Sequence, residues 1–514
     1  MEYFYSTFRN LFDFSLNTEN ALLIGSIMLF LSILAGKAGY KTGLPILLLF
    51  LGIGMAMGED GLGLKFSDAR VAQFIGTVAL SIILFSGGMD TKIENARPVW
   101  KQGLILSTIG VFLTALITGG FIYSVSHMIG GNFELSFCES LLLASVMSST
   151  DSASVFSLLR SSGLNLDKKL RSTLELESGS NDPMAYILTI LLIEIVKSGS
   201  FDAAKSLVEF AVQLSFGLLF GYVLGRITVF LLNKINIDNA AMYSSLLLGS
   251  AIFTFSITNK FAGNGYLAVY VAGLAIGNSK FSHKRAIAAF FESFAWLWQI
   301  IMFLALGLLV NPCELLNIFW IGLAIAAFMT IAARPLAVFL CLFAFKMKKR
   351  EKSYISWVGL KGAVPIIFAT YPLIANVEKA QMMFNIVFFT TLVSLLVQGT
   401  TVAPLARKFG LVREGGLGGS EFGVELSEDI KSSMSEIEIS EKMLENGSRL
   451  MDLRLPENTL VVMVKRNGNY FVPQGKTSLS PKDKVLVISD KGEELEKIYA
   501  QLGIENRFID KGKI

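Results

Sequence analysis

The chain has little of what disulfide-bonded proteins and soluble enzymes rely on. Its 514 residues include only 3 cysteines and 2 histidines. Cys138, Cys313 and Cys341 lie singly in or beside apolar stretches, without CxxC spacing, so neither a disulfide framework nor a zinc site is expected. The sequence also lacks a P-loop, a DKTG run and a nucleophile–base pair. It therefore predicts no enzyme, no cofactor and no use of ATP.

Charged residues are scarce as well. They make up 17% of the chain, and the formal net charge is only +4. Hydrophobic residues make up 53%, and the mean hydropathy is +0.57. A soluble core rarely reaches such values over this length, so we expect a multi-spanning membrane protein surrounded by lipid, with no nucleic-acid partner.

Apolar runs predict about 13 transmembrane helices. They cover roughly 18–36, 43–58, 71–89, 99–125, 136–160, 171–198, 206–233, 240–258, 264–280, 287–310, 314–345, 354–374 and 383–406. With the N-terminus outside, the inner loops hold 19 Lys and Arg residues and the outer loops hold 6. Cytoplasmic loops collect positive charge, so we expect the N-terminus outside and the C-terminus in the cytoplasm. The first run lacks a basic n-region and a convincing cleavage site, and we interpret it as a retained span.

The apolar pattern stops near Phe409, which divides the chain. We expect a transmembrane domain over 1–409, a linker over 410–427 with the run GGLGGS, a small domain over 428–506 and a tail over 507–514. Within the small domain, 460–464 and 484–488 predict strands, 466–469 a turn and 493–502 an amphipathic helix. The pattern indicates a cytoplasmic α+β module.

The membrane part has the organisation of an inverted duplication. Six spans, a seventh as connector and six more place the two halves in opposite orientations. The polar run at Thr150-Asp151 interrupts the fifth span, and Gly359 to Pro365 interrupts the twelfth, the fifth of the second half. Interrupted helices at matching positions are the best sequence indication of a transporter's binding site.

Three polar groups fall near the middle of the bilayer. Asn181-Asp182 lies about eleven residues into the sixth span, which at ~1.5 Å per residue places the carboxylate near the centre of a ~30 Å hydrocarbon slab. Thr150-Asp151 and Lys361 lie at similar depth in their own spans. Ionisable groups there are costly and mark functional sites, so the three segments predict an ion site.

Asp182 is the group that could bind either a proton or a cation. Asn181, Ser180 and Ser178 add oxygen ligands of the kind that a hard monovalent cation prefers. Pro183 has no amide hydrogen and clashes with the carbonyl of Gly179, so we expect the helix to be locally open there. Competition for one carboxylate is a mechanism of exchange. The alternative is that Asp182 is a neutral carboxyl group hydrogen-bonded to a neighbouring helix.

The other polar groups have structural interpretations. Asp151 could neutralise the positive end of a broken half-helix and Lys361 a negative end. Ser148 and Ser154 could simply bond back to helix carbonyls. Glu177 lies too deep for easy exposure and is expected to form a buried ion pair with either Arg334 or Lys361.

The run from Glu177 to Pro183, Ser149-Thr150-Asp151 and the run Gly359 to Pro365 (GLKGAVP) together resemble monovalent cation:proton antiporters of the NhaP/NHE type. The resemblance covers roughly 18–408. It implies a homodimer in a bacterial cytoplasmic (inner) membrane, an inverted-repeat fold with crossing broken helices, and elevator-like alternating access. It implies Asp182 as cation and proton carrier, with Thr150, Ser178 and Asn181 near the ion and electroneutral exchange.

Two positions depart from the family pattern. Lys361 stands where many members have arginine in GLRGAVP, and it lacks arginine's planar fork. Gly179-Ser180 replaces a common Leu-Leu, a variation associated with the potassium/proton subgroup.

The C-terminal module resembles a TrkA-C (RCK-C) domain, a small dimeric regulatory unit of potassium transport systems. The resemblance rests on the runs 453–456, 466–468, 473–475 and 479–483. No GxGxxG follows a strand in this tail, so NAD binding is not expected. Both a smaller regulatory nucleotide at the module's dimer interface and a purely structural dimerising role stay open.

The favoured function is antiport of K⁺, or Na⁺, against H⁺. A cation channel gated by the RCK-C-like module is the alternative, but no carbonyl filter such as TVGYG occurs. A symporter for an organic anion would favour Arg at the site over a lone Asp with oxygen donors.

Overall fold

The computed structural model describes residues 18–42, 45–64, 66, 68–235, 239–413, 433–444, 447–453, 459–466 and 468–489. The chain divides near Val412 into a large helical unit and a small C-terminal unit, which are described separately. The predicted linker from 414 onward, the predicted helix at 493–502 and the tail at 507–514 lie outside the described residues.

Each predicted apolar segment coincides with a helix or a pair of helices. In chain order these are α2 (Thr18–Thr42), α3 (Ile46–Met57), α4 (Ala69–Asp90), α5 (Ile93–Ala96), α6 (Trp100–Ile105), α7 (Val111–Ile129), α8 (Phe137–Val146), α9 (Ser152–Ser161), α10 (Lys168–Ser198), α11 (Ala203–Lys234), α12 (Ala240–Lys260), α13 (Gly265–Gly277), α14 (Lys284–Leu308), α15 (Pro312–Asn317), α16 (Phe319–Phe328), α17 (Arg334–Cys341), α18 (Lys349–Trp357), α19 (Ala363–Ile374) and α20 (Ala380–Lys408). Short strands β1 (Asn165–Leu166) and β2 (Val412–Arg413) pair with each other.

Eight of the described helices are long and apolar enough to cross a membrane, and several shorter apolar helices accompany them. The prediction of a mostly helical, multi-spanning membrane unit is therefore confirmed. Two of the long helices contain a π-helical turn, η1 (Leu106–Gly110) between α6 and α7 and η3 (Met329–Ala333) between α16 and α17. Such turns often occur at functional sites.

Two spans are interrupted where the sequence predicted breaks. The chain is not helical between Val146 and Ser152, or between Trp357 and Ala363. In contrast, α10 remains one continuous helix through Pro183. The local opening expected at that proline is wrong, because a single missing amide removes only one bond from a long, otherwise bonded helix.

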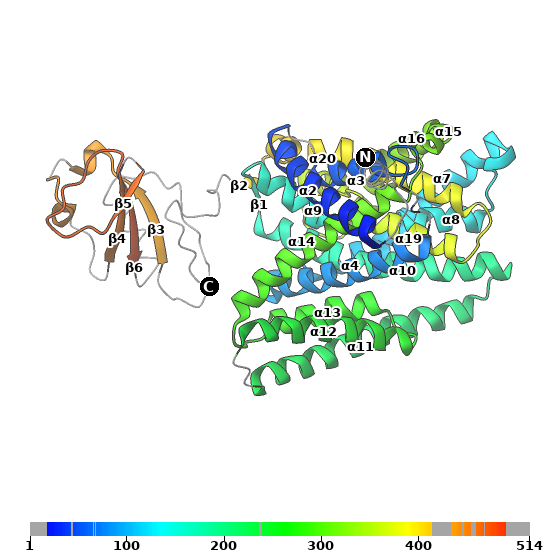
Figure 1. Ribbon diagram of the computed structural model, residues 1–514, viewed down its shortest axis with the longest axis horizontal. Helices are drawn as coiled ribbons and strands as arrows, with labels where there is room; N and C mark the ends of the chain where they lie inside the picture. Colours follow the sequence, from blue (N-terminus) through cyan, green and yellow to red (C-terminus); the bar gives the residue numbers. More distant parts are fainter. Residues whose placement is uncertain are drawn as a thin grey trace, which may run out of the picture. The chain divides into compact units, whose positions relative to one another are not determined.

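A layer of closely packed helices, α3, α4, α13 and α14, lies beside the interrupted spans. Glycines allow backbones to meet in this layer: a Cβ added at Gly54 would lie 2.9 Å from the Cα of Gly307, and one added at Gly88 would lie 2.4 Å from the Tyr270 carbonyl. On the far side of α13, α11 and α12 run alongside it (Figure 1). We call α3, α4, α13 and α14 the glycine-packed layer.

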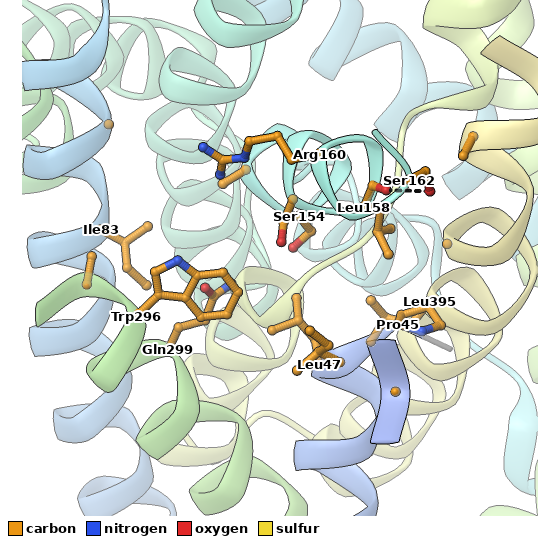
Figure 2. Close-up of a pocket in the computed structure, with 18 of the residues that line it drawn as sticks. Pro45, Leu47, Ile83, Ser154, Leu158, Arg160, Ser162, Trp296, Gln299 and Leu395 are labelled. Atoms are coloured by element: carbon orange, nitrogen blue, oxygen red, sulfur yellow. Dashed lines mark hydrogen bonds between the residues drawn. The ribbon is translucent and has the colours of Figure 1, made fainter. Parts of the chain in front are cut away.

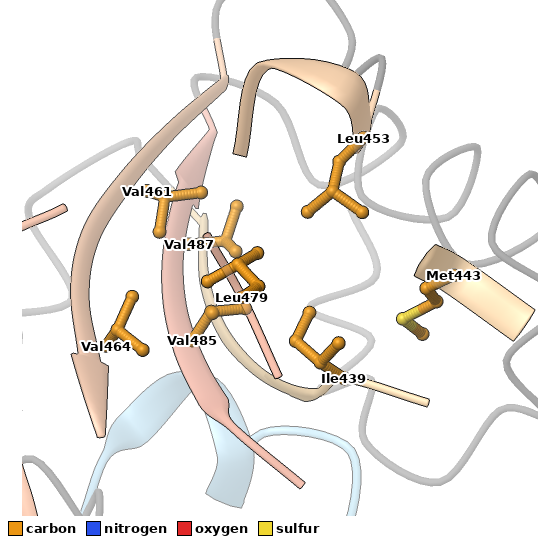
Figure 3. Packing of buried hydrophobic residues seen from close by; sticks show 8 residues of the cluster. All are labelled: Ile439, Met443, Leu453, Val461, Val464, Leu479, Val485 and Val487. Atoms are coloured by element: carbon orange, nitrogen blue, oxygen red, sulfur yellow. The ribbon is translucent and has the colours of Figure 1, made fainter. Parts of the chain in front are cut away.

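The small unit is a four-stranded antiparallel sheet in the order β3–β6–β4–β5. Its strands are β3 (Ser433–Glu438), β4 (Thr459–Arg466), β5 (Asn469–Phe471) and β6 (Lys484–Ser489). Two short 3₁₀ helices, Glu441–Leu444 and Leu450–Leu453, accompany the sheet. Valines of β4 and β6 pack with Ile439, Met443, Leu453 and Leu479 into one apolar core (Figure 3). The two predicted strands are confirmed as β4 and β6, whereas β3 and β5 were not predicted.

Candidate functional site

The two interrupted spans meet at their non-helical segments. The amide of Asp151 donates a 2.8 Å hydrogen bond to the carbonyl of Leu360, so one backbone hydrogen bond joins the two segments. We call residues 147–151 and 358–362 the crossing. Four helix ends converge here, the C-termini of α8 and α18 and the N-termini of α9 and α19. Each end carries free backbone groups and a partial charge that a buried site must neutralise.

Asp151 lies next to both helix N-termini and caps one of them. Its carboxylate accepts hydrogen bonds from the amide of Ser154, at 3.0 Å, and from the Ser154 hydroxyl, and so caps α9. On its other side lies Gly362, the residue before α19, where an added Cβ would lie 2.3 Å from Asp151 Oδ2. Position 362 therefore has no room for a side chain.

Lys361 lies on the carbonyl side of the same crossing. Its buried ammonium group donates to the carbonyl of Ser149 at 2.8 Å, just beyond the end of α8. Its amide donates to the Ser394 hydroxyl of α20 at 2.9 Å. The Lys361 side chain thus lies near the C-terminal end of a helix, where the helix dipole favours positive charge.

Helix α10 supplies the third wall of the site. The Ser178 hydroxyl donates to the carbonyl of Thr150 at 2.8 Å and accepts the amide of Ser152 at 3.1 Å, which joins α10 to the crossing. One turn further, the Asn181 side-chain amide donates to the Thr150 hydroxyl at 2.6 Å. This bond turns the other end of the amide, Oδ1, away from Thr150.

Three oxygens at this wall are buried without a hydrogen-bond partner among the described residues. They are Asp182 Oδ1, Asn181 Oδ1 and Ser149 Oγ. Burying a carboxylate and leaving polar oxygens unbonded both cost free energy, and native proteins rarely leave such groups unpaired without a functional reason. A carboxylate with neutral oxygens is the donor set for a hard monovalent cation, and the carboxylate alone can hold a proton.

Glu177 pairs with Arg334, and not with Lys361. The Arg334 guanidinium, at the start of α17 directly after η3, forms an ion pair with the Glu177 carboxylate, and both side chains are buried. Gly359 of the crossing covers the guanidinium, since an added Cβ would lie 2.9 Å from Arg334 Nε. The pair ties α10 to α17 beside the site.

A cavity of about 420 Å³ opens on one side of the crossing. It lies between α9 and α20 on one side and α3, α4 and α14 on the other, and Figure 2 shows Ser154 directed into it opposite Trp296. Its wall includes Asp90 and Glu292 from the glycine-packed layer and Arg160 and Arg407 from α9 and α20. Because Ser154 bonds to Asp151, the cavity reaches the first polar group of the crossing.

The structure brings the candidate residues from three distant sequence regions to one place, and adds others. Gly362 and Ser394 were not singled out by the sequence. Asn264 was also missed: its side chain donates to the Pro183 carbonyl at 2.9 Å, which joins α13 to α10 beside Asp182. An asparagine inside an apolar run was the available signal, although it also caps α13. The alternative for Ser148 holds, since its hydroxyl bonds the Ser145 carbonyl at 2.6 Å, whereas Ser154 bonds Asp151.

The chain is similar to known transport proteins. Residues 25–408 match the family described as sodium/hydrogen exchanger, transmembrane, and residues 443–503 match the TrkA-C domain. The chain is 38% identical over 489 residues to a K⁺/H⁺ antiporter NhaP2 of Shewanella sp. (strain MR-4), covering 93% of this chain and 83% of that one. It is 37% identical over 475 residues to a K⁺/H⁺ antiporter NhaP of Alkalimonas amylolytica, covering 91% and 80%.

The solved structure of the sodium proton antiporter MjNhaP1 from Methanocaldococcus jannaschii superposes with a TM-score of 0.65 at 25% identity, covering 76% of this chain and 99% of that one. The family match spans most of the helical unit, including both interrupted spans and α10. The chain therefore belongs to the sodium/hydrogen exchanger family, with a C-terminal TrkA-C domain.

Proposed function

We propose that this protein is a secondary antiporter that exchanges a monovalent cation, K⁺ in preference to Na⁺, for H⁺. The observation that carries the proposal is the buried Asp182 carboxylate, whose Oδ1 has no partner among the described residues; the preceding residue, Asn181, has an equally unpaired Oδ1. Relatives named K⁺/H⁺ antiporters, and the TrkA-C domain, support K⁺. A solved relative named a sodium proton antiporter supports the same chemistry with Na⁺.

The exchange follows from competition for one charge. When Asp182 holds a proton it is neutral, and when it holds a cation the pair is also neutral. The site then carries the same charge in both loaded states, so one cation exchanges for one proton without net charge movement. A charged carboxylate without a bound ion is costly in a medium of low dielectric constant. This cost disfavours movement of the site across the membrane when neither a cation nor a proton is bound.

Asn181, Thr150 and Ser178 prepare the site in this proposal. Thr150 orients Asn181 so that its carbonyl oxygen is free for the cation. Ser178 holds the Thr150 carbonyl and the Ser152 amide, which keeps the non-helical segment in place. Asp151 and Lys361 balance the helix ends, and the Glu177–Arg334 pair fixes α10 against α17.

The helical unit supports an inverted repeat of 13 membrane crossings, six on each side of α11. In this division the fourth members, α6–α7 and α16–α17, both carry a π-helical turn, and the fifth members, α8–α9 and α18–α19, are both interrupted. Matching irregularities at matching positions are what a duplicated transporter fold would contain.

Elevator-like alternating access would move the crossing and α10 against the glycine-packed layer. The cavity beside Ser154 would be the cytoplasmic entrance, since it lies among loops that the distribution of Lys and Arg places inside. A bacterial inner membrane, an outside N-terminus, a cytoplasmic C-terminus and a homodimer complete the proposed arrangement.

The C-terminal domain is proposed as a regulator of cation exchange. Its proposed limits are 428–506, after a linker at 410–427 that follows the transmembrane domain 1–409. A nucleotide at its dimer interface, or dimerisation alone, would supply the regulation. The physiological task would be release of excess cytoplasmic K⁺ against protons, with effects on cytoplasmic pH and cell volume.

Proton flux in sealed proteoliposomes tests the proposal. A pH gradient is imposed, K⁺ or Na⁺ is added, and wild type is compared with Asp182→Asn and with the control Asp167→Asn. Asp167 caps the start of the same helix and asparagine also caps well, so this control should keep its activity. Cation-triggered proton movement that is lost only in Asp182→Asn supports antiport. Cation flux without proton movement would instead indicate a channel.

A further inference from the structure

The third unpaired oxygen of the site belongs to Ser149, whose hydroxyl has no assigned part in the proposed function. Two adjacent serines of the crossing have the same burial, with Ser148 and Ser149 each 1% exposed. The Ser148 hydroxyl donates to the Ser145 carbonyl at 2.6 Å, whereas Ser149 Oγ has no partner among the described residues. Serine in a non-helical segment has carbonyls nearby to bond, so an unbonded buried hydroxyl is unusual.

Ser149 is held in place by its own backbone. Its carbonyl accepts the Lys361 ammonium at 2.8 Å, and the carbonyl of the next residue accepts the Ser178 hydroxyl at 2.8 Å. The residue is thus fixed between α10 and the crossing on both sides. The backbone at Ser149 cannot move out of the site without breaking a charge-assisted bond.

The Ser149 hydroxyl is close enough to the Asp182 carboxylate to donate a hydrogen bond to it. Among the described residues, Ser149 Oγ, Asp182 Oδ1 and Asn181 Oδ1 nonetheless lack a partner with full hydrogen-bond geometry. A hydroxyl that donates its proton to a carboxylate keeps two lone pairs, so the Ser149 oxygen can still accept a small cation. A hydroxyl and an amide oxygen are neutral, so they add ligands without adding charge.

We propose that Ser149 is a cation ligand that sets the affinity and selectivity of the site for the transported monovalent ion. This inference rests on the proposed function, and it assigns a role to Ser149 Oγ, the third unpaired oxygen of the site. A proton needs only the carboxylate, whereas a dehydrated cation needs several oxygens. Removal of the Ser149 hydroxyl therefore weakens cation binding and leaves proton binding by Asp182 in place.

The test measures cation-triggered proton flux in proteoliposomes as a function of K⁺, Na⁺ and Rb⁺ concentration. Ser149→Ala is expected to raise the KM for K⁺ about tenfold, the factor that corresponds to roughly 1.4 kcal/mol of binding free energy. The maximal rate at saturating K⁺ and its pH profile stay close to wild type. The ratio of KM values for K⁺ and Na⁺ changes, because the two ions differ in size and lose the same ligand.

Ser148→Ala is the matched control, since it removes an equally buried hydroxyl one residue away that already has a partner. It should leave every KM unchanged. Ser149→Thr keeps the hydroxyl and should keep a KM for K⁺ near that of wild type. Where Ser149→Ala does not fold, Ser149→Cys carries the test, because it preserves the side-chain size and replaces the hard oxygen with soft sulfur.

A wild-type KM for K⁺ in Ser149→Ala or Ser149→Cys overturns the inference. So does an equal rise of KM in Ser148→Ala and Ser149→Ala, because that result would indicate a structural effect. Loss of exchange in Asp182→Asn with normal KM values in the Ser149 variants refutes only the ligand assignment. Normal exchange in Asp182→Asn refutes the proposed function itself.

Discussion

The glycine-packed layer and the crossing lie next to each other and solve opposite problems. In the layer, backbones meet with no side chain between them: a Cβ added at Gly307 would lie 2.5 Å from the Leu51 carbonyl, and one at Gly273 would lie 2.3 Å from the Phe85 carbonyl. None of the described residues in its four helices is a buried charged residue. In the crossing and on the helices beside it, Glu177, Asp182, Arg334 and Lys361 are all buried.

The difference indicates that the glycine-packed layer is a rigid support, whereas the crossing holds the charged groups of the site. Close packing of small residues gives the layer many weak contacts that are lost together, which suits a fixed support. The crossing depends on a few directed bonds between helix ends and charged groups, so single substitutions there should affect transport more than stability. The cavity beside Ser154 separates the two regions on one side.

The largest effect is expected at the ion pair that holds α10. Glu177→Gln leaves the Arg334 guanidinium buried without a carboxylate, which typically costs ~3–5 kcal/mol. We expect a clear fall in the free energy of unfolding, measured by denaturant titration in detergent micelles. The double variant Glu177→Gln/Arg334→Met should recover much of the loss, because no charge is then left unpaired. A single variant as stable as wild type would show that the pair is not structural.

The second prediction compares an alanine substitution at one glycine of the glycine-packed layer with one at a glycine of the crossing. Gly307→Ala should lower stability by ~1–3 kcal/mol through overpacking, while the folded fraction keeps its KM for K⁺. Gly362→Ala inserts a methyl group against Asp151 and should reduce the transport rate more than its loss of stability explains. Gly120→Ala, with no atom near the new methyl group, is the neutral control. Equal behaviour of the Gly307 and Gly362 variants would remove the distinction between the two regions.

The smallest effect is expected in the C-terminal domain. Burial raises the pKa of Asp483, but hydrogen bonds from Arg466 and the Ser480 amide outweigh it, and the net pKa lies below the ordinary value. Such a depressed pKa adds stability above the unfolded pKa of ~3.9, and this contribution disappears as the pH falls through the folded value. Because the Arg466 side chain is 36% exposed, water screens the pair, and Asp483→Asn should cost ~0.5–1 kcal/mol at neutral pH.

Hydrogen exchange of the β6 amides in the full-length protein measures this effect. Between pH 7 and pH 3 the wild-type domain should lose protection, and Asp483→Asn should show little of this acid dependence. Transport at saturating K⁺ should be unchanged at neutral pH where the variant domain remains folded. An identical acid dependence in the two proteins would contradict the assignment.

The sequence was sufficient to predict the two interruptions, because a polar run inside an apolar span disfavours a continuous helix facing lipid. The depth of Asp182 in the membrane stays a prediction, based on counting residues along its span. The partner of Glu177 could not be chosen, because Arg334 and Lys361 have equal charge and only the crossing brings Lys361 to the Ser149 carbonyl. The continuity of α10 through Pro183 was also beyond prediction, since it depends on tertiary packing.

The space around a residue is equally invisible in the sequence. Gly362 stood in a motif that already drew attention, but nothing in one chain shows that Asp151 occupies the place of its missing side chain. Ser148 and Ser149 are the same residue type side by side, and only the three-dimensional arrangement shows which hydroxyl has a partner.

The most direct test of the shared carboxylate is the KM for K⁺ measured at a series of pH values in proteoliposomes. If K⁺ and H⁺ compete for Asp182, the KM rises about tenfold for each unit of falling pH in the acid range, while the maximal rate at saturating K⁺ remains constant. A KM that does not change with pH, accompanied by a maximal rate that does, would mean that the two ions bind different groups and would contradict the account.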